Sequence, residues 1–248
     1  MKGALVGLVV GMMALGAPRA EAHMRDFLVT EEYYTTSRGE FEVELKNNMN
    51  FPEADNSATY NSEHQIELEY GITDHLQLAY YEVFTWDRSQ DWERDAFQVE
   101  AKYRFAEAGQ WPVDLALYIE YKNPDGHREL RSDVLENKVI LGKNLGRWNL
   151  AFNFVFEKEL NNSEPWEYEY TLGASYEVTP RFQVGVEIKE GLGDSHSFRV
   201  FDGEQNLQLI PSVAFNVTSH IRMIVGPAFG LTRSSDDFQL RSIVECEF

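Results

Sequence analysis

Apolar and polar residues alternate in runs of about ten residues from position 39 to the end of the chain, and this period of two constrains the fold most. Phe41, Val43 and Leu45, for example, are each followed by a charged residue. Successive side chains of a β-strand point to opposite faces, so each run predicts a strand with one apolar face. Twelve such strands are expected, beginning near residues 41, 63, 76, 97, 113, 135, 148, 166, 182, 207, 221 and 238.

Short and long connections alternate strictly between these runs. The short ones cover 73–75, 106–111, 146–147, 179–181 and 218–220, and the long ones cover 52–61, 87–95, 122–134, 159–165, 190–205 and 232–236. Short periplasmic turns, longer external loops and an even strand count are typical of outer-membrane barrels. The sequence therefore predicts an all-β fold: an antiparallel transmembrane β-barrel of about 12 strands with both termini in the periplasm.

The alternative is a soluble sandwich or lipocalin-like barrel whose apolar faces point inward. Twelve apolar faces rich in large aromatics would overfill a small closed barrel, whereas they need no internal room if they face lipid. We therefore expect Phe152, Phe154 and Phe156 to face lipid, and Asn153 and Glu157 to face the lumen. Aromatics also recur near the predicted strand ends, as an interfacial girdle requires: Phe51, Trp86, Phe105, Trp111, Tyr121, Trp148, Trp166 and Phe182.

Two places conflict with regular strands. Glu82 has the parity of the apolar face, and a carboxylate in hydrocarbon is unfavourable. We expect a β-bulge near Tyr80-Tyr81 that reverses the parity, or a Glu82 displaced to the headgroup level. Pro211 and Pro227 cannot donate to a strand ladder, so a second irregularity is expected there.

The N-terminus has the pattern of a secretory signal peptide. A basic start is followed by an apolar run over 4–17 and by Ala20-Glu21-Ala22, which fits the A-x-A cleavage rule. We therefore expect three parts: a signal peptide at 1–22, an N-terminal periplasmic or plug segment at 23–38, and the barrel at 39–248. Export and the strand pattern together predict the outer membrane of a Gram-negative bacterium.

The composition excludes several functional classes. The formal net charge of −19 argues against nucleic acid as a partner, because phosphate binding needs clustered Lys and Arg. A single cysteine, Cys246, excludes a disulfide framework and every Cys-rich metal site. His23, His75 and His220 lie at separate places, so neither a metal site nor a cofactor is expected. The charged outer loops are expected to contact membrane lipid and lipopolysaccharide.

Several short segments resemble a broad group of Gram-negative outer-membrane barrels. Residues 24–32, the following 39–45 segment and the Tyr70-Gly71-Ile72-Thr73-Asp74-His75-Leu76 turn resemble the start of these proteins. The group is described as putative transporters, or as related to the barrel associated with the meta-cleavage pathway of phenol degradation. Phe248 resembles the terminal aromatic that the barrel assembly machinery reads. The resemblance implies a fold, a location and this assembly partner, and it supplies no catalytic residues.

The parity opposite to the apolar face is expected to line the lumen, and it is mainly acidic. Sixteen acids and seven bases have this parity, so the inner wall has a net charge of about −9, and such a lumen should favour cations. The alternative is that these groups are mutual ion pairs that hold the barrel closed. The residues expected to set selectivity are Glu42, Glu44, Lys46, Glu67, Glu69, Glu100, Lys102, Arg104, Glu120, Glu187, Arg222 and Arg241.

Residue size differs around the predicted wall. Charges at mid-height fall on the first four strands, whereas strands seven to eleven carry small or uncharged residues there: Asn153, Thr171, Gly173, Gly185, Ser212, Gly226 and Ala228. Small residues leave space for a ligand or a plug to approach the backbone. The candidate plug is the 23–38 segment, and an extended periplasmic tail is the alternative.

Candidate catalytic chemistry is limited to one outward pair. Ser62 and His64 share the apolar parity near the external end of the second strand, as an outer-membrane phospholipase would require. Those enzymes place His before Ser, and we expect no outward Asn or Gln at this height to orient the imidazole. Ser195 and His196, beside Asp194, are interpreted as polar loop residues.

The sequence thus predicts a passive channel or carrier for a small solute with an acidic, cation-favouring lumen. It is not expected to be an enzyme. The alternatives are a lipid-acting hydrolase that uses Ser62 and His64, and a structural barrel that binds another envelope protein. The channel hypothesis predicts conductance in planar bilayers, and the hydrolase hypothesis predicts phospholipid hydrolysis.

Overall fold

The computed structural model describes residues 24–51, 62–86, 92–124, 132–160, 163–201 and 205–248. The predicted signal peptide at 1–22 lies outside the described residues. Twelve strands form: β1 Phe41–Asn50, β2 Ser62–Thr73, β3 Leu76–Trp86, β4 Trp92–Arg104, β5 Asp114–Pro124, β6 Val134–Leu145, β7 Trp148–Glu159, β8 Glu167–Thr179, β9 Phe182–Asp194, β10 Leu207–Asn216, β11 Ile221–Gly230 and β12 Phe238–Glu247. No helix among these residues is long and apolar enough to span a membrane.

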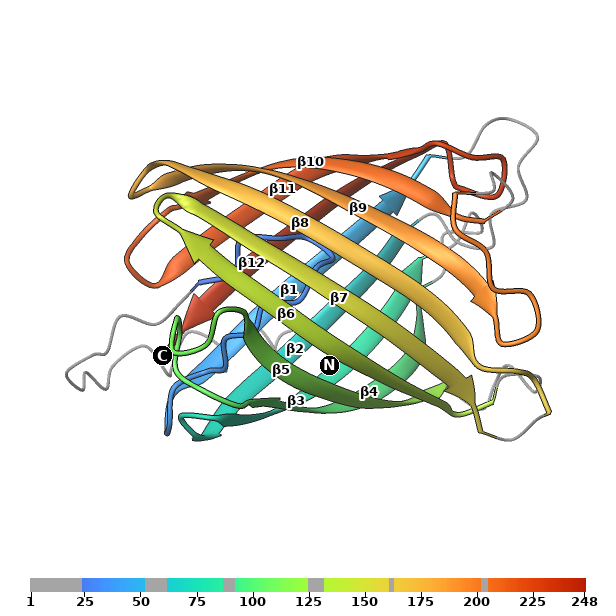
Figure 1. Cartoon of the computed structure of the whole chain (residues 1–248), viewed down its shortest axis with the longest axis horizontal. Coiled ribbons are helices and arrows are strands. Elements are labelled where there is room, and N and C mark those ends of the chain that lie inside the picture. Colours follow the sequence, from blue (N-terminus) through green and yellow to red (C-terminus); the bar gives the residue numbers. More distant parts are fainter. Residues whose placement is uncertain (1–23, 52–61, 87–91, 125–131, 161–162, 202–204) are drawn as a thin grey trace.

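The strands form one closed antiparallel barrel in which each pairs with its sequence neighbours and β1 pairs with β12 (Figure 1). The backbone N–H groups of Phe41 and Phe248 each donate to the other residue's carbonyl, at 3.3 and 2.8 Å, which extends this closing ladder by one residue. The predicted fold is therefore confirmed. Three predicted loops are shorter than expected, because β4 begins at Trp92, β5 continues to Pro124 and β9 continues to Asp194.

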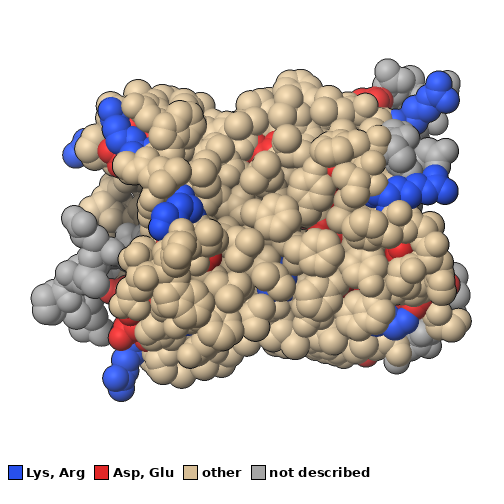
Figure 2. Space-filling view, in the orientation of Figure 1, with Lys and Arg blue, Asp and Glu red and all other residues tan. Residues whose placement is uncertain are grey.

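The side chains alternate between the two faces of the wall as predicted. Asn153 is buried in the lumen, where it contacts the N-terminal segment, whereas Phe152 and Phe154 have the opposite parity. Large apolar side chains such as Leu45 and Ile119 are 43 % and 46 % exposed on the outside. Figure 2 shows a broad band of largely uncharged residues between two ends where Lys, Arg, Asp and Glu gather. This is the surface that a membrane-spanning barrel presents to lipid.

The two irregularities differ from each other in outcome. The expected bulge at Tyr80-Tyr81 is wrong: the register shifts between Val83 and Phe84, and Glu82 keeps its outward parity. Glu82 is instead compensated by Arg94 on β4, whose Nε donates to its carboxylate at 2.7 Å. At the prolines, pairing between β10 and β11 stops after Leu209 and resumes at Val213 in the same register, which places both prolines in the interruption.

The N-terminal residues 24–38, which we call the luminal segment, lie inside the barrel (Figure 1). Phe27 and Tyr33 are 0 % and 1 % exposed. The segment continues into β1 through Gly39, whose φ of 81° is readily adopted only by glycine. Hydrogen bonds, ion pairs and apolar clusters connect the segment to all twelve strands.

Candidate functional site in the barrel lumen

A row of acidic residues follows the cross-strand pairing around the inner wall. From β12 through β1 to β9, ten successive paired positions hold nine acids and one alanine: Glu247, Glu42, Glu69, Ala79, Glu100, Glu120, Glu136, Glu157, Glu167 and Asp194. We call these nine acids the acidic rung. Because strands tilt in a barrel, the rung rises from the last residue of β12, at the short-turn end, to the last residue of β9, at the loop end.

The acidic rung concentrates like charge. Seven of its cross-strand pairs join two acids, and like charges directly opposite each other destabilise a sheet. Near the short-turn end, carboxylate oxygens of Glu42, Glu245 and Glu247 lie within 4.8 Å of one another, as do those of Glu42, Glu44 and Glu69. Oxygen-rich groups of this kind suit hard cations.

The expected ion-pair lattice is also present, beside the rung. Lys46 lies 2.9 Å from Glu44 and 2.5 Å from Glu67. Lys138 lies 2.9 Å from Glu136. Neighbouring acids thus hold these bases, and one of the acids, Glu136, belongs to the rung.

The remaining residues predicted for selectivity occupy different heights. Glu100 accepts a hydrogen bond from Tyr81, and Glu120 accepts one from Tyr118 at 2.6 Å. Arg104 lies near the short-turn end, where it is 2.8 Å from Glu107, and Arg241 donates to Gln239 at 2.7 Å. Lys102 and Arg222 contact the luminal segment, through Glu31 at 3.6 Å and Asp26 at 2.6 Å. The predicted set is thus not one site.

Glu187 on β9 is the main polar anchor of the luminal segment. Its buried carboxylate accepts the backbone N–H groups of Leu28, Val29 and Thr30 at 2.7, 2.9 and 2.7 Å. The side chain of Asn153 then accepts from the N–H of Glu31 at 2.6 Å and donates to its carbonyl at 2.8 Å. Four consecutive residues of an irregular segment are thereby satisfied inside the barrel.

The small residues of the inner wall receive the large side chains of the segment. A Cβ on Gly173 would lie 2.8 Å from the Phe27 ring, and one on Gly142 would lie 2.3 Å from the Tyr33 ring. Leu28 joins an apolar cluster with Ile210, Ala214, Ile224, Ala228 and Ile243. Each glycine therefore provides the space that the facing side chain occupies.

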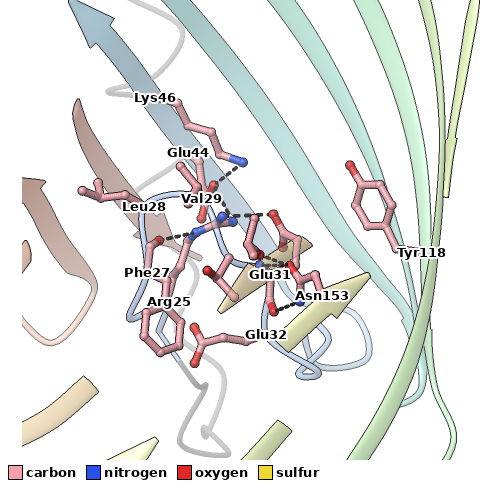
Figure 3. A network of polar contacts seen from close by, with 12 residues as sticks. Arg25, Phe27, Leu28, Val29, Glu31, Glu32, Glu44, Lys46, Tyr118 and Asn153 are labelled. Carbon is pink, nitrogen blue, oxygen red and sulfur yellow. Dashed lines mark hydrogen bonds and ion pairs between the residues drawn. The ribbon is translucent and has the colours of Figure 1, made fainter. Parts of the chain in front are cut away.

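Arg25 joins the luminal segment to the charged residues of the wall (Figure 3). Its guanidinium lies 3.0 Å from Glu31 and 3.7 Å from Glu44, and its Nε donates to the carbonyl of Phe27 at 2.7 Å. Burial alone would raise the pKa of the Glu31 carboxyl, but Arg25 and Lys102 hold that pKa well below its usual value. Glu31 is therefore ionised at neutral pH and ties the segment to β4, whereas Arg25 ties it to β1.

The lumen is open on one side of the luminal segment and nearly filled on the other. Two cavities of about 520 and 440 Å³ lie toward the long loops. The larger is lined by Glu136, Glu157, Glu167 and Asp194 of the acidic rung. Among the segment, Glu42, Glu69 and Glu247, the space is about 50 Å³. The described residues thus form a vestibule that ends on the luminal segment.

The outward pair predicted from the sequence is in hydrogen-bond contact. Oγ of Ser62 lies 2.8 Å from Nε2 of His64, and Nδ1 of His64 lies 2.8 Å from Oδ1 of Asn47. The expectation that no outward Asn or Gln lies at this height is wrong. Asn47 is on β1 and pairs directly with His64, an alignment that depends on the register between two strands.

Comparisons with known proteins identify a fold. No family model and no curated protein matches the chain. Solved structures that it resembles include an outer membrane channel from Pseudomonas putida F1, with a TM-score of 0.60 and 11 % identity over 87 % of this chain and 98 % of that one. The KdgM porin has a TM-score of 0.58 and 9 % identity over 84 % and 99 %. The NanC porin has 0.55 and 11 % over 82 % and 98 %. The chain has the architecture of these outer-membrane barrels.

Proposed function

We propose that this protein is an outer-membrane channel of a Gram-negative bacterium whose lumen favours cations and whose passage is closed by the luminal segment. The acidic rung carries this proposal. Nine acids at ten paired positions destabilise the barrel, because like charges lie opposite each other. The simplest reason for their presence is a function of the negative electrostatic potential that they create in the lumen.

The rung would act by raising the local concentration of cations. Fixed charge in a confined, low-dielectric space attracts counter-ions and repels ions of its own sign. The vestibule places Glu157 and Glu167 directly opposite each other on β7 and β8, and Glu136 opposite Glu157 on the other side. A cation or a cationic solute entering from the loop end passes these carboxylates.

The names of the structural neighbours agree with this proposal, since two are called porins and one a channel. The apolar outer band supports a membrane location, with lipid and lipopolysaccharide around it. We also propose that Phe248 is read by the barrel assembly machinery, as its resemblance to other terminal aromatics implies. We further propose that the protein is related to the transporters of the phenol meta-pathway group. The solute that it passes is a small molecule.

Planar-bilayer recording of the full chain tests the channel. The wild type should show low conductance, and Glu187→Ala, which removes the acceptor for three backbone N–H groups, should raise it several-fold. Glu157→Ala, which also removes a lumen carboxylate, is the matched control for the barrier and should not open the passage. A barrel that shows the heat-dependent gel shift of a folded protein but conducts in no variant would refute the proposal.

A further inference from the structure

Three polar side chains on the outer face of β1 and β2 form a continuous hydrogen-bonded chain. It runs from the Ser62 hydroxyl to the His64 imidazole and then to the Asn47 amide, with both distances at 2.8 Å. A serine beside an imidazole nitrogen, with the other nitrogen held by a third group, is the arrangement that activates a nucleophile.

The protonation pattern is fixed by the neighbours. Oδ1 of Asn47 faces Nδ1 of His64, and Nδ2 of Asn47 donates to the Ser242 hydroxyl at 3.4 Å. Oδ1 can only accept, which places the proton of the neutral ring on Nδ1. Nε2 is then the basic nitrogen, and it is the one that contacts Ser62. This is the tautomer that a general base requires.

The three hydrogen-bonded side chains lie on the face of the barrel wall that faces lipid, near the loop end of the barrel. Asn47 has the parity of Leu45 and Met49, which are 43 % and 41 % exposed, and Ser62 is the first residue of β2. The Trp92 ring, itself 63 % exposed, reaches from β4 to within 4.8 Å of the His64 ring, measured between centroids. Arg94 lies on the same cross-strand row as His64.

We propose that Ser62, His64 and Asn47 form a hydrolytic site for an acyl ester of a membrane lipid. The position at the loop end supplies lipid with the ester near the headgroup. Phospholipids and the acylated glycolipid of lipopolysaccharide share this chemistry. A purely structural role would require only that each of these polar groups has a hydrogen-bond partner beside the lipid. It would not require a nucleophile, a base and an orienting amide to follow one another in this order.

The reaction balances with water as the only co-reactant. Ser62 Oγ attacks the ester carbonyl carbon as its proton passes to Nε2 of His64. The bond from that carbon to the alkoxy oxygen breaks, and His64 returns the proton to the leaving oxygen. Water then attacks the acyl-serine, His64 moves its proton to Oγ, and the fatty acid is released. Asn47 acts as a positioning residue.

A fluorophosphonate probe tests the nucleophile on the full-length, detergent-folded protein. The probe should bond to Ser62 with loss of fluoride, as located by peptide mass spectrometry. Ser62→Ala should abolish labelling, and His64→Ala should slow it by about 10²–10⁴-fold. Asn47→Ala should slow it as well, whereas Asn47→Asp, which still accepts from Nδ1, should restore most of the rate. Ser195→Ala removes another serine beside a histidine and should label as the wild type does.

Access is tested separately, because Ser62 is only 6 % exposed. Trp92→Ala uncovers the His64 ring and should label on Ser62 faster than the wild type. Fatty-acid release from phosphatidylethanolamine vesicles and from lipopolysaccharide micelles then identifies the lipid: release from either one, dependent on Ser62, supports the proposal. Labelling of Ser62 in neither the wild type nor Trp92→Ala, or labelling without release from either lipid, would overturn it.

Discussion

Single residues determine how the luminal segment is held. Glu187 accepts three consecutive backbone N–H groups, and hydrogen bonds to a charged group are worth about 1.5–3 kcal/mol each. Glu187→Ala should therefore shift the docked-to-undocked ratio by roughly a thousandfold or more. In a Cys246→Ser background, the buried Thr30→Cys should react much faster with a water-soluble maleimide when Glu187 is absent. An unchanged rate would show that Glu187 does not anchor the segment.

The glycines of the wall make a second prediction at this scale. Gly173→Leu would put its side chain where the Phe27 ring lies, since even a Cβ would be 2.8 Å from that ring. We expect the same rise in Thr30→Cys labelling, with the barrel still folded by its gel shift. Ala174→Leu is the control, because the next residue on β8 has the opposite parity. Equal labelling in both variants would contradict the packing described above.

Glu82 and Arg94 show how one residue is tolerated on the wrong face. Their 2.7 Å contact compensates a carboxylate that has the parity of the lipid-facing residues. Arg94→Leu should destabilise the barrel by about 1 kcal/mol or more, because an outward charge loses its partner. Glu82→Leu combined with Arg94→Leu should recover that loss. Urea unfolding in liposomes measures both, and additive losses in the double variant would contradict the pairing.

At the scale of elements, the strands follow from local alternation, so eleven connections and twelve strands could be placed from the sequence. The β4 and β9 boundaries differ because pairing with a neighbouring strand extends an element into residues that look like loop: Trp92 pairs with Trp86, and Asp194 pairs with Glu167. The 23–38 segment could be predicted as a candidate plug because strands seven to eleven have small residues on the predicted inner wall. Which residue faces which glycine depends on the path of an irregular segment.

Register explains what sequence reasoning missed. The acidic rung and the Asn47 contact with His64 both require knowing which residues of adjacent strands are opposite each other. The connections predicted at 52–61 and 87–95 are long, so loop length does not fix that alignment, and the register shift between Val83 and Phe84 alters it again. The acids could be assigned to the lumen by parity alone, but not to one continuous row.

At the scale of the whole molecule, the structure changes which charges should control selectivity. Glu44 and Glu67 belong to the residues expected to set selectivity, yet both hold Lys46 and are buried. Reversing them would bring new positive charges beside Lys46 and Arg25, so the barrel should lose stability rather than only selectivity. The acids of the vestibule, Glu157 and Glu167, are the ones that mobile ions should encounter.

The reversal potential under a KCl gradient tests the central claim most directly. In the open Glu187→Ala background the current should be cation-selective, and Glu157→Gln with Glu167→Gln should move the reversal potential toward zero. Fixed charges act over about one Debye length, roughly 8–10 Å near physiological salt, so two neighbouring carboxylates should be felt across the vestibule. Glu177→Gln, a lumen acid outside the rung, should have a smaller effect. An anion-selective current, or one that the rung substitutions leave unchanged, would contradict the account.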